Sequence, residues 1–382
     1  MINCRIKDLT KIFEKSNLQA SEGKDKGNYP FYTSSSVLSK YYDDYLYEGN
    51  AITMGTGGMA SINYVDQKFA TSTDCYNFTA NEYTKFVYYY LLSQLKEIND
   101  IGFQGMGLKH LQKDYINTMK ITIPDDYKRI TNFLDKKVEE IDNVIEKTKE
   151  TIEDYRKYKQ AIITELVTKG LDKNVEFQDT DSEWIGKIPK HWKYVRINTL
   201  FHTVDERNFD ENALLLSLYT AIGVKPRNEL EEKGNKAVTV LNYKKVKKND
   251  IIVNKLLAWM GAIAYSEYEG VTSPDYDVYR AKNNANVIKD YYNAYFRFTN
   301  FKGDCHRYGH GIMLMRWRTY PEELLRIRVP NPPLDEQIKI AEEINKKCFE
   351  IDNLISSKEK IIEELEQYKK SLIYEYVTGK KK

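Results

Sequence analysis

The sequence lacks a large excess of charge, a long apolar run and paired cysteine motifs. Its formal net charge is only +2, so any affinity for nucleic acid has to come from local clusters of cations. No apolar run approaches the roughly 20 residues that span a bilayer, and the opening "MINCRIKDLTKIFEK" contains no apolar secretory segment. The four cysteines are scattered without CxxC spacing, which favours reduced thiols. We therefore expect a cytoplasmic protein without a membrane segment.

Common catalytic motifs are missing as well. The sequence contains no GxxxxGK[ST] loop, no HExxH and no GxSxG. Cys305, His306 and His310 lie close together, but no second pair of ligands accompanies them, so an ordinary loop is favoured over a zinc site. The pairs Asp43–Asp44 and Asp125–Asp126 are typical of solvated turns and helix caps. The sequence therefore predicts no metal site and no catalytic residue.

A long internal repeat is the clearest positive signal. Residues 130–168, "ITNFLDKKVEEIDNVIEKTKETIEDYRKYKQAIITELVT", align without a gap with residues 340–378, "IAEEINKKCFEIDNLISSKEKIIEELEQYKKSLIYEYVT". About sixteen of the 39 aligned positions are identical, and the shared blocks "EIDN", "YK" and "VT" keep one register. The chain therefore contains two related halves.

Both copies of the repeat predict a long helix with one apolar stripe. Apolar residues recur at alternating steps of four and three, which is the heptad pattern of a coiled coil. Each helix would be about 55 Å long at 1.5 Å per residue. Neither helix is apolar all round, so we expect the two copies to pack on each other. The predicted seam consists of Leu134, Ile141, Ile145, Ile152, Ile162, Ile344, Ile351, Ile355, Ile362 and Leu372.

The segments that precede the two helices resemble each other more weakly. "ATSTDCYNF" parallels "VTSPDYDVY", and "GMGLKHL" (Gly105–Leu111) parallels "GHGIMLMRW" (Gly309–Trp317). Strand-type runs alternate with short helical runs in both segments. We predict an α+β fold with two mixed α/β domains, 1–122 and 171–328, separated by helical regions 123–170 and 329–382 that form an antiparallel coiled coil.

Two short motifs resemble those of DNA amino-methyltransferases. "FQGMG" is similar to their FxGxG cofactor loop, and "NPPL" (Asn331–Leu334) is similar to their catalytic NPP-aromatic loop. However, Leu334 has no aromatic ring on which a flipped base could stack. Pro332 and Pro333 instead suit the end of a strand and the first turn of a helix, where Asp335 and Glu336 would favour the positive end of the helix dipole. We interpret the motif as the start of a helix.

The order domain, helix, domain, helix resembles the DNA-specificity subunit of type I restriction–modification systems. The phrases "NPPLDEQIKIAEEI", "KQAIITELVTKGLDKN" and "SEWIGKIPKHWKYVRI" are typical of that family, and the resemblance covers essentially the whole chain. It implies a subunit without a catalytic centre, whose two target-recognition domains each read half of a bipartite double-stranded DNA target. The helices would set the spacing and dock two modification subunits. S-adenosylmethionine and ATP would belong to modification and restriction subunits, not to this chain.

Residues that contact DNA are predicted from cations and polar groups in the glycine-containing repeated loops. Glycine allows the backbone to approach a duplex closely, and Arg or Lys can reach guanine edges or phosphates. "KKVKK" (Lys244–Lys248) is open to two interpretations, a phosphate-contacting patch or a solvated turn. The candidates are Thr56, Ser61, Lys109, His110, Lys255, Trp259, Arg307, His310, Arg316 and Arg318.

Two other functions remain open at this point. A scaffold that binds only protein would show no specific duplex binding in a gel shift, even with methylation partners present. A self-contained DNA adenine methyltransferase would bind S-adenosylmethionine as an isolated chain.

Overall fold

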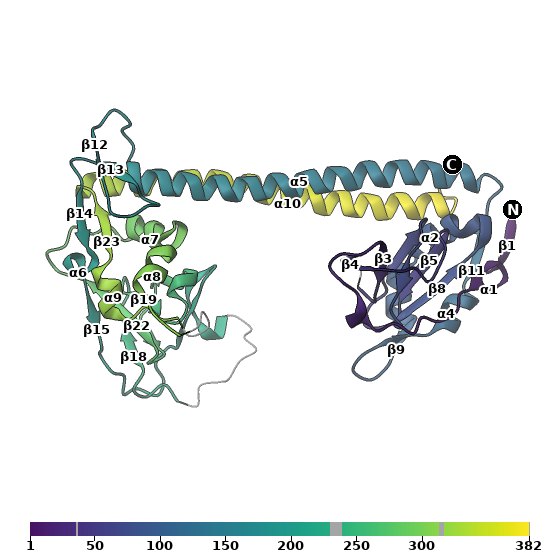
Figure 1. Cartoon of the computed structure of the whole chain (residues 1–382), viewed down its shortest axis with the longest axis horizontal. Coiled ribbons are helices and arrows are strands. Elements are labelled where there is room, and N and C mark those ends of the chain that lie inside the picture. Colours follow the sequence, from purple (N-terminus) through teal and green to yellow (C-terminus); the bar gives the residue numbers. More distant parts are fainter. Residues whose placement is uncertain (36, 230–238, 313–316, 382) are drawn as a thin grey trace. The chain divides into compact units, whose positions relative to one another are not determined.

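The computed structural model describes residues 1–35, 37–229, 239–312 and 317–381 of the 382-residue chain. It divides into two compact units, Met1–Glu150 with Ser357–Lys382, and Thr151–Ser356. Each unit contains one mixed α/β domain and part of both long helices (Figure 1). The compact units thus divide the long helices between them.

The domain of the first unit contains a four-stranded sheet in the order β2-β8-β5-β6, a ribbon β1-β11, a three-stranded sheet β4-β3-β7 and a hairpin β9-β10. The pairings are antiparallel except for β3 with β7. Its elements are β1 (Ile2–Arg5), α1 (Ile6–Leu9), β2 (Lys11–Ile12), β3 (Tyr29–Tyr32), β4 (Lys40–Tyr42), β5 (Ala51–Gly55), β6 (Ile62–Val65), β7 (Ala70–Thr71), β8 (Cys75–Thr79), α2 (Thr84–Ser93), α3 (Leu95–Ile101), β9 (Phe103–Gln104), β10 (His110–Leu111), α4 (Lys113–Thr118) and β11 (Lys120–Ile123), with 3-10 turns at Ala20–Glu22 and Asn81–Tyr83.

The domain of the second unit repeats this order, with a four-stranded sheet β15-β22-β19-β20 and a ribbon β14-β23. Three further antiparallel pairs are β12-β13, β16-β17 and β18-β21. Its elements are β12 (Phe177–Asp179), β13 (Lys187–Pro189), β14 (Lys193–Arg196), α6 (Ile197–Leu200), β15 (Phe201–Val204), β16 (Leu216–Tyr219), β17 (Gly223–Pro226), η3 (Arg227–Glu229), β18 (Lys244–Val246), β19 (Ile251–Asn254), η4 (Ala258–Met260), β20 (Ile263–Tyr265), β21 (Gly270–Thr272), β22 (Tyr276–Ala281), α7 (Lys289–Phe298), α8 (Phe301–Tyr308), α9 (Pro321–Arg326) and β23 (Arg328–Asn331).

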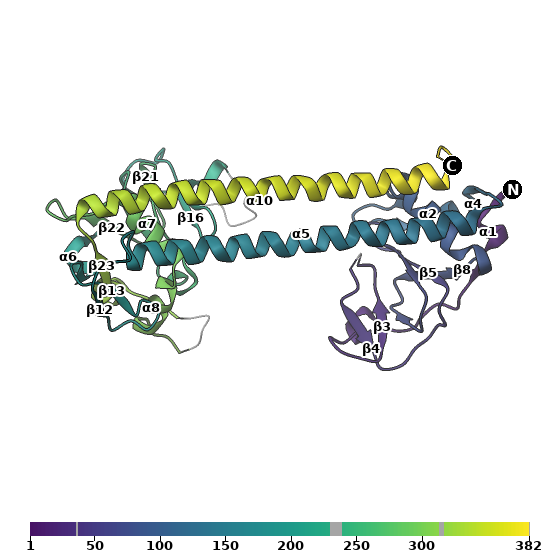
Figure 2. The same cartoon turned by 90° about the horizontal axis from the view of Figure 1, so that it is seen from above.

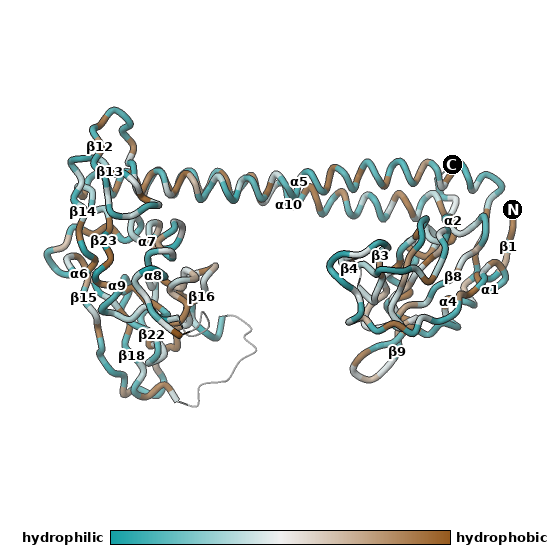
Figure 3. The backbone as a smooth tube through the Cα atoms, viewed as in Figure 1, coloured by the Kyte–Doolittle hydropathy of each residue, from teal (hydrophilic) through white to brown (hydrophobic). Residues whose placement is uncertain are grey.

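One inner strand of each four-stranded sheet is buried on both faces. Every residue of β5, "AITMG", and of β19, "IIVN", is buried. These strands therefore show a continuous apolar run instead of strict alternation, as expected for strands covered on both sides. Figure 3 shows hydrophobic residues gathered within each domain. Burial of Ile52, Phe78 and Phe86 fixes the first sheet against α2 and thereby positions the loops at the end of β5.

The two long helices begin directly after a strand and a proline-containing turn. β11 ends at Ile123, and α5 (Tyr127–Lys169) begins after "PDD". β23 ends at Asn331, and α10 (Leu334–Val377) begins after Pro332 and Pro333. Proline disfavours continued strand pairing and is preorganised for the start of a helix. The "NPPL" segment is thus the start of a helix.

The long helices are antiparallel in the first unit. Phe133 of α5 stacks on Tyr376 of α10, with ring centroids 4.5 Å apart. Nine residues further along α5, Asp142 accepts a hydrogen bond from Lys369 Nζ at 2.5 Å. Because the partner on α10 moves backward as the position on α5 moves forward, the helices run in opposite directions.

The second unit contains the same ion pair formed by the opposite copies. Lys159 Nζ of α5 lies 2.7 Å from a carboxylate oxygen of Asp352 of α10. In the repeat, Lys159 corresponds to Lys369 and Asp352 corresponds to Asp142. Exposed pairs of this kind contribute at most about 1 kcal/mol. They specify the register, whereas the apolar seam supplies most of the stabilisation.

The structure buries most of the expected seam. The buried members are Leu134, Ile141, Ile145, Ile152, Ile344, Ile351, Ile355 and Leu372, and Ile362 is half-buried. Ile162 is half-buried as well, and the neighbouring Ile163 is more deeply buried, at 1% exposed. A straight α-helix drifts by about 20° per heptad relative to a 3.5-residue repeat. The buried stripe has therefore moved by one residue where α5 meets the second domain.

Asp304 is a buried carboxylic acid in the core of the second unit. Burial raises its pKa to about 6, although the hydrogen bond from Trp184 Nε1 at 2.7 Å and the charge of Arg307 act in the opposite direction. The folded protein thus binds this proton more tightly than the unfolded chain, whose Asp has a pKa near 3.9. The contribution of Asp304 to stability is fully favourable below about pH 4 and decreases as the pH rises through about 6.

We predict that Asp304→Asn flattens the pH dependence of unfolding between about pH 4 and 6.5, because asparagine keeps an acceptor for Trp184 without titrating. The difference should be on the order of 2–3 kcal/mol across this range. Thermal or urea unfolding of the full chain at several pH values measures it. The exposed Asp179→Asn is the matched control. An Asp304→Asn profile parallel to that of the unmodified chain would contradict the prediction.

Candidate nucleic-acid interface

Two loops of the first domain are joined through main-chain atoms. The first loop follows β5 (residues 55–61) and the second is the β9-β10 hairpin (residues 103–111). Leu111 N donates to Thr56 O at 2.9 Å, and Gly58 N donates to Lys109 O at 2.9 Å. We call these two loops, and their equivalents in the second domain, the two-loop surface. Its position is fixed by the buried strand β5 and the hairpin, not by its side chains.

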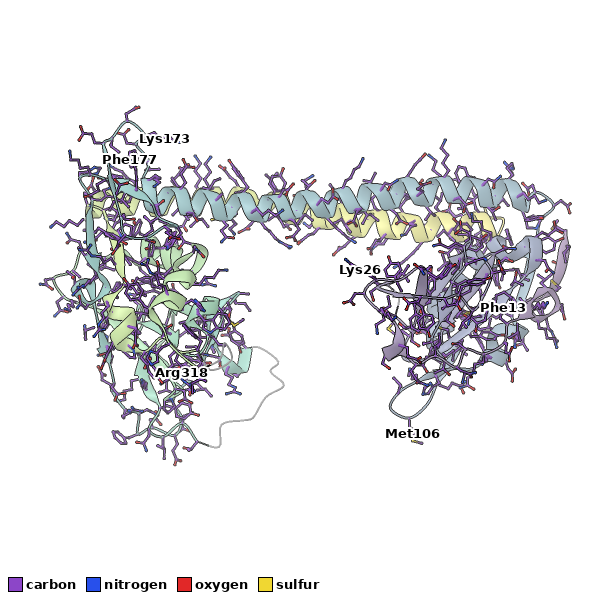
Figure 4. The ribbon with its side chains drawn as sticks, in the orientation of Figure 1. Phe13, Lys26, Met106, Lys173, Phe177 and Arg318 are labelled. Carbon is purple, nitrogen blue, oxygen red and sulfur yellow. The ribbon has the colours of Figure 1, made fainter. Side chains whose placement is uncertain are left out.

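Glycine shapes the hairpin of the first two-loop surface. Gly105 and Gly107 have φ angles of +146° and +87°, which residues with a side chain rarely adopt. The loop consequently projects from the domain, and Figure 4 shows Met106 at its tip. Lys109, just before β10, and His110, the first residue of β10, are both exposed. The hairpin thus presents a cation, an imidazole and an apolar tip to solvent.

The second domain contains the same arrangement. Thr319 N donates to Lys255 O at 3.0 Å, as Leu111 N does to Thr56 O. Asn254 N donates to Ala262 O at 3.1 Å, as Gly55 N does to Ser61 O at 2.9 Å. The second two-loop surface therefore comprises residues 254–262 and 310–318, of which 313–316 lie outside the described residues. A bridge between His310 and Arg318 closes its hairpin.

The candidate residues of the first domain differ in accessibility. Thr56 is partly exposed, and its Oγ1 donates to Asp74 O at 2.9 Å, so its acceptor lone pairs remain available. Lys109 is exposed, and no carboxylate pairs with it in the described part of the chain. The prediction for Ser61 is wrong, because Ser61 is 3% exposed and its Oγ accepts a hydrogen bond from Gly55 N. Ser61 closes the loop and does not face solvent.

In the second domain the candidate Trp259 also has a structural contact. It is half-buried, its Nε1 donates to Leu256 O at 2.9 Å, and its ring lies edge-on to His306 with centroids 6.1 Å apart. Lys255 is half-buried and uses its carbonyl in the tie to Thr319. Trp259 therefore supports the loop, and only the exposed part of its ring is accessible.

The remaining candidates lie around the second hairpin. Arg307 is exposed and donates to Asp181 O at 3.2 Å. His310 is exposed, with Nδ1 3.4 Å from Glu323 Oε1. Arg318 is half-buried and is labelled in Figure 4. The candidate Arg316 lies outside the described residues.

The "KKVKK" patch contains one structural lysine. Lys244 is buried, and its Nζ donates to the buried Asp277 at 2.9 Å. It therefore cannot reach a phosphate without losing this pair. Lys245, Lys247 and Lys248 are exposed. Three lysines of the patch are thus accessible to a phosphate, whereas Lys244 has a structural role.

Sequence reasoning missed the exposed apolar residues of both two-loop surfaces. Met106 is fully exposed, Met59 is 71% exposed and Ile312 is 92% exposed. Met260, which occupies the same place in the second domain as Met59, is 51% exposed. Such side chains can contact the methyl group of thymine in the major groove. The glycines on both sides of Met106 were the available signal, because they indicate the tip of a loop.

The "NPPLDEQ" segment forms a polar network that holds the start of α10. Gln337 is fully buried; its Oε1 accepts from Ile288 N at 2.9 Å, and its Nε2 donates to Asn331 Oδ1 at 3.0 Å and Pro332 O at 2.9 Å. Glu336 accepts hydrogen bonds at 2.8 Å from Trp192 Nε1 and lies 2.8 Å from His191 Nε2. Asn331 thus supports the fold, and the resemblance to a methyltransferase loop does not extend to its surroundings.

Within the described part of the chain, no group of three or more His, Cys, Asp or Glu residues is arranged to hold a metal ion. The helices found there are too short or too polar to cross a membrane.

Comparison with known proteins identifies the family. Residues 2–154 and 189–367 match the family model described as the type I restriction modification DNA specificity domain. The chain is 24% identical to the type I restriction enzyme MjaVIII specificity subunit of Methanocaldococcus jannaschii, over 86% of this chain and 76% of that protein. It is 20% identical to the type I restriction enzyme EcoDI specificity subunit of Escherichia coli, over 86% of this chain and 77% of that protein.

A solved structure shares the fold. This structure concerns "complex assembly and conformational transition of the type I R-M system". It superposes on this chain with a TM-score of 0.69 at 12% sequence identity, and the match covers 98% of this chain and 97% of the other. At this identity the likeness supports the arrangement of helices and strands and no more.

Proposed function

Because this chain belongs to the family of type I restriction–modification DNA-specificity subunits, the non-catalytic DNA-recognition components of their complexes, we propose that each of its two domains reads one half of a bipartite target. The observation that carries this proposal is the two-loop surface. Both domains have the same order of strands in the four-stranded sheet and share one main-chain tie between the loops, Leu111 N to Thr56 O and Thr319 N to Lys255 O, but the side chains on the loops differ. Two domains with the same backbone framework but different side chains on their loops can recognise two different base sequences by direct contacts with the bases.

The paired helices would set the gap between the half-sites. The repeated Lys–Asp pair and the apolar seam hold the helices in one register in both units. Between two half-sites on one face of B-DNA the centre-to-centre distance is about 34 Å, or roughly 10 bp. DNA in the gap would be contacted only at phosphates and would be free in sequence.

The helices would also dock two modification subunits. Exposed apolar residues recur at equivalent places in the two copies, with Val144 and Leu354 at 49% and 47% exposure and Tyr158 and Tyr368 at 57% and 53%. Repeated exposed apolar groups are typical of protein-binding surfaces. Exposed apolar side chains at equivalent positions of the two helices suit two copies of one partner. In this proposal S-adenosylmethionine and ATP belong to the modification and restriction subunits.

A paired insertion tests the spacing role. We predict that one additional heptad after Glu150 of α5 and one after Lys360, the equivalent position in α10, lengthens the preferred gap by about 3 bp, because seven helical residues add about 10 Å. Both half-sites should be unchanged. Sequencing of sites methylated by the assembled complex in a library with gaps of varied length measures the effect.

Replacement of seven residues at each of these places by the same heptads, without a change of length, is the control. If the inserted chain selects the original gap, the helices do not set the spacing.

A further inference from the structure

A cleft with a volume of about 610 Å³ lies in the second unit where both long helices meet the domain. Figures 1 and 2 both show α7 beside the long helices at this place. The β16-β17 turn and the end of η4 complete the wall. The residues used below are Arg156, Lys159, Arg297, Lys302, Asp352 and Met260.

The lining of this cleft is strongly cationic. Among the described residues, the lining contains four cations, Arg156, Lys159, Arg297 and Lys302, and one carboxylate, Asp352. Arg156 also forms an ion pair with Glu153 of the same helix, at the edge of the cleft. Asp352 already pairs with Lys159 at 2.7 Å. A positive excess therefore remains within a concave wall, where the field of several cations adds up more strongly than on an open surface.

Arg297 is held in place by the β16-β17 turn. Its guanidinium donates to Ala221 O at 2.9 Å. Gly223, with a φ angle of +96°, provides the space for this guanidinium, because a Cβ at this position would lie only 3.3 Å from it. Because the guanidinium is partly withdrawn from water, burial lowers the pKa of Arg297. An anion in the cleft would offset this loss of hydration.

The first unit lacks two of these four cations. In the register of the helical repeat, Glu366 stands where α5 has Arg156. The helix α2 of the first domain corresponds to α7 of the second, and both have ten residues. The ninth residue is Leu92 in α2 and Arg297 in α7. The cationic cleft is therefore not a general consequence of packing the helices on a domain.

We propose that this cleft binds a phosphate group of the DNA backbone in the gap beside the second half-site. The proposal rests on the proposed function, because it requires DNA on the second two-loop surface. Met260 belongs to that surface and also lines the cleft. An adjoining hollow of about 450 Å³ shares Met260 and Lys302 with the cleft and reaches the candidate Trp259. A phosphate held there would contribute affinity and position without reading a base.

The test is a double substitution of the two exposed cations, Arg156→Gln with Lys302→Gln. The full chain, assembled with its partner subunits, is titrated with duplex DNA at several salt concentrations. Each phosphate contact contributes about 0.9 to the slope of log K against log salt, so loss of the one phosphate held in the cleft should reduce the slope by about 1. The preference for the target over duplexes with scrambled half-sites should not change.

The control removes two exposed lysines of the first unit, Lys96→Gln with Lys149→Gln. Lys96 is the second residue of α3, and Lys302 is the second residue of α8, so the two lysines hold the same position in their helices. A slope equal to that of this control would overturn the proposal, and so would an altered half-site preference, because the cations would then read bases. Thermal unfolding of both variants checks that they are folded.

Inorganic phosphate distinguishes DNA from a free anion. If phosphorus NMR detects phosphate binding to the unmodified complex but not to the double variant, while the salt slope stays unchanged, the cleft serves a free anion and the assignment to DNA fails. The slope can be measured on any duplex. A complex without half-site preference would therefore refute the proposed function and leave the phosphate test readable.

Discussion

Replacing Met106, Leu108 and Lys109 together by alanine should remove discrimination at one half-site and leave the other half-site intact. These side chains project from the first hairpin, whereas its main-chain ties to the loop after β5 involve no side chain of this set. A good base contact contributes about 1–3 kcal/mol, so loss of the set should reduce selectivity at that half-site by about 100-fold or more.

Site selection from a library with both half-sites randomised measures this effect, read out as methylated sequences in cells that carry the partner subunits. The matched control, Lys26→Ala with Val37→Ala and Leu38→Ala, removes one exposed cation and two exposed apolar groups elsewhere in the first domain. If the control relaxes the half-site and the hairpin variant does not, recognition lies outside the two-loop surface.

The second large effect is expected at Gln337. Gln337→Leu keeps an approximate volume but leaves the amide of Ile288, the carbonyl of Pro332 and the side chain of Asn331 without this buried partner. An unsatisfied buried polar group costs about 1–3 kcal/mol. We expect a loss of about 3–4 kcal/mol in unfolding free energy, or roughly 10 °C in the melting temperature of a unit of this size.

Calorimetry of the full chain measures this loss, with Gln367→Leu on the exposed face of the same helix as the control. Gln367 is solvated, so its replacement should change the melting temperature by little. Equal melting temperatures for the two variants would show that the Gln337 network is dispensable.

The helical repeat could be predicted because its information is periodic and local. A heptad stripe specifies which face is buried wherever the partner is another helix, as at Ile141 and Ile351. The pattern did not indicate the deeper burial of Ile163, because a domain core is the additional partner there and no periodicity in the helix encodes the position of that core.

The candidate interface was only partly predictable, because exposure in a loop is decided by contacts that are distant in sequence. Ser61 and Thr56 belong to one loop, but Ser61 turns inward to Gly55 while Thr56 is partly exposed. Conversely, Met59 and Met106 have the side chains of core residues and lie on the surface, because glycines and main-chain ties form their loops.

Those main-chain ties also bear on how such a protein can diverge. The bonds Leu111 N to Thr56 O and Thr319 N to Lys255 O are available to any residue that is not proline at the donor. Mutation of the neighbouring exposed positions therefore costs little folding free energy. Selection can alter what the protein recognises while the architecture is inherited unchanged, and the different residues at equivalent places, Thr56 and Lys255, are an example of that freedom.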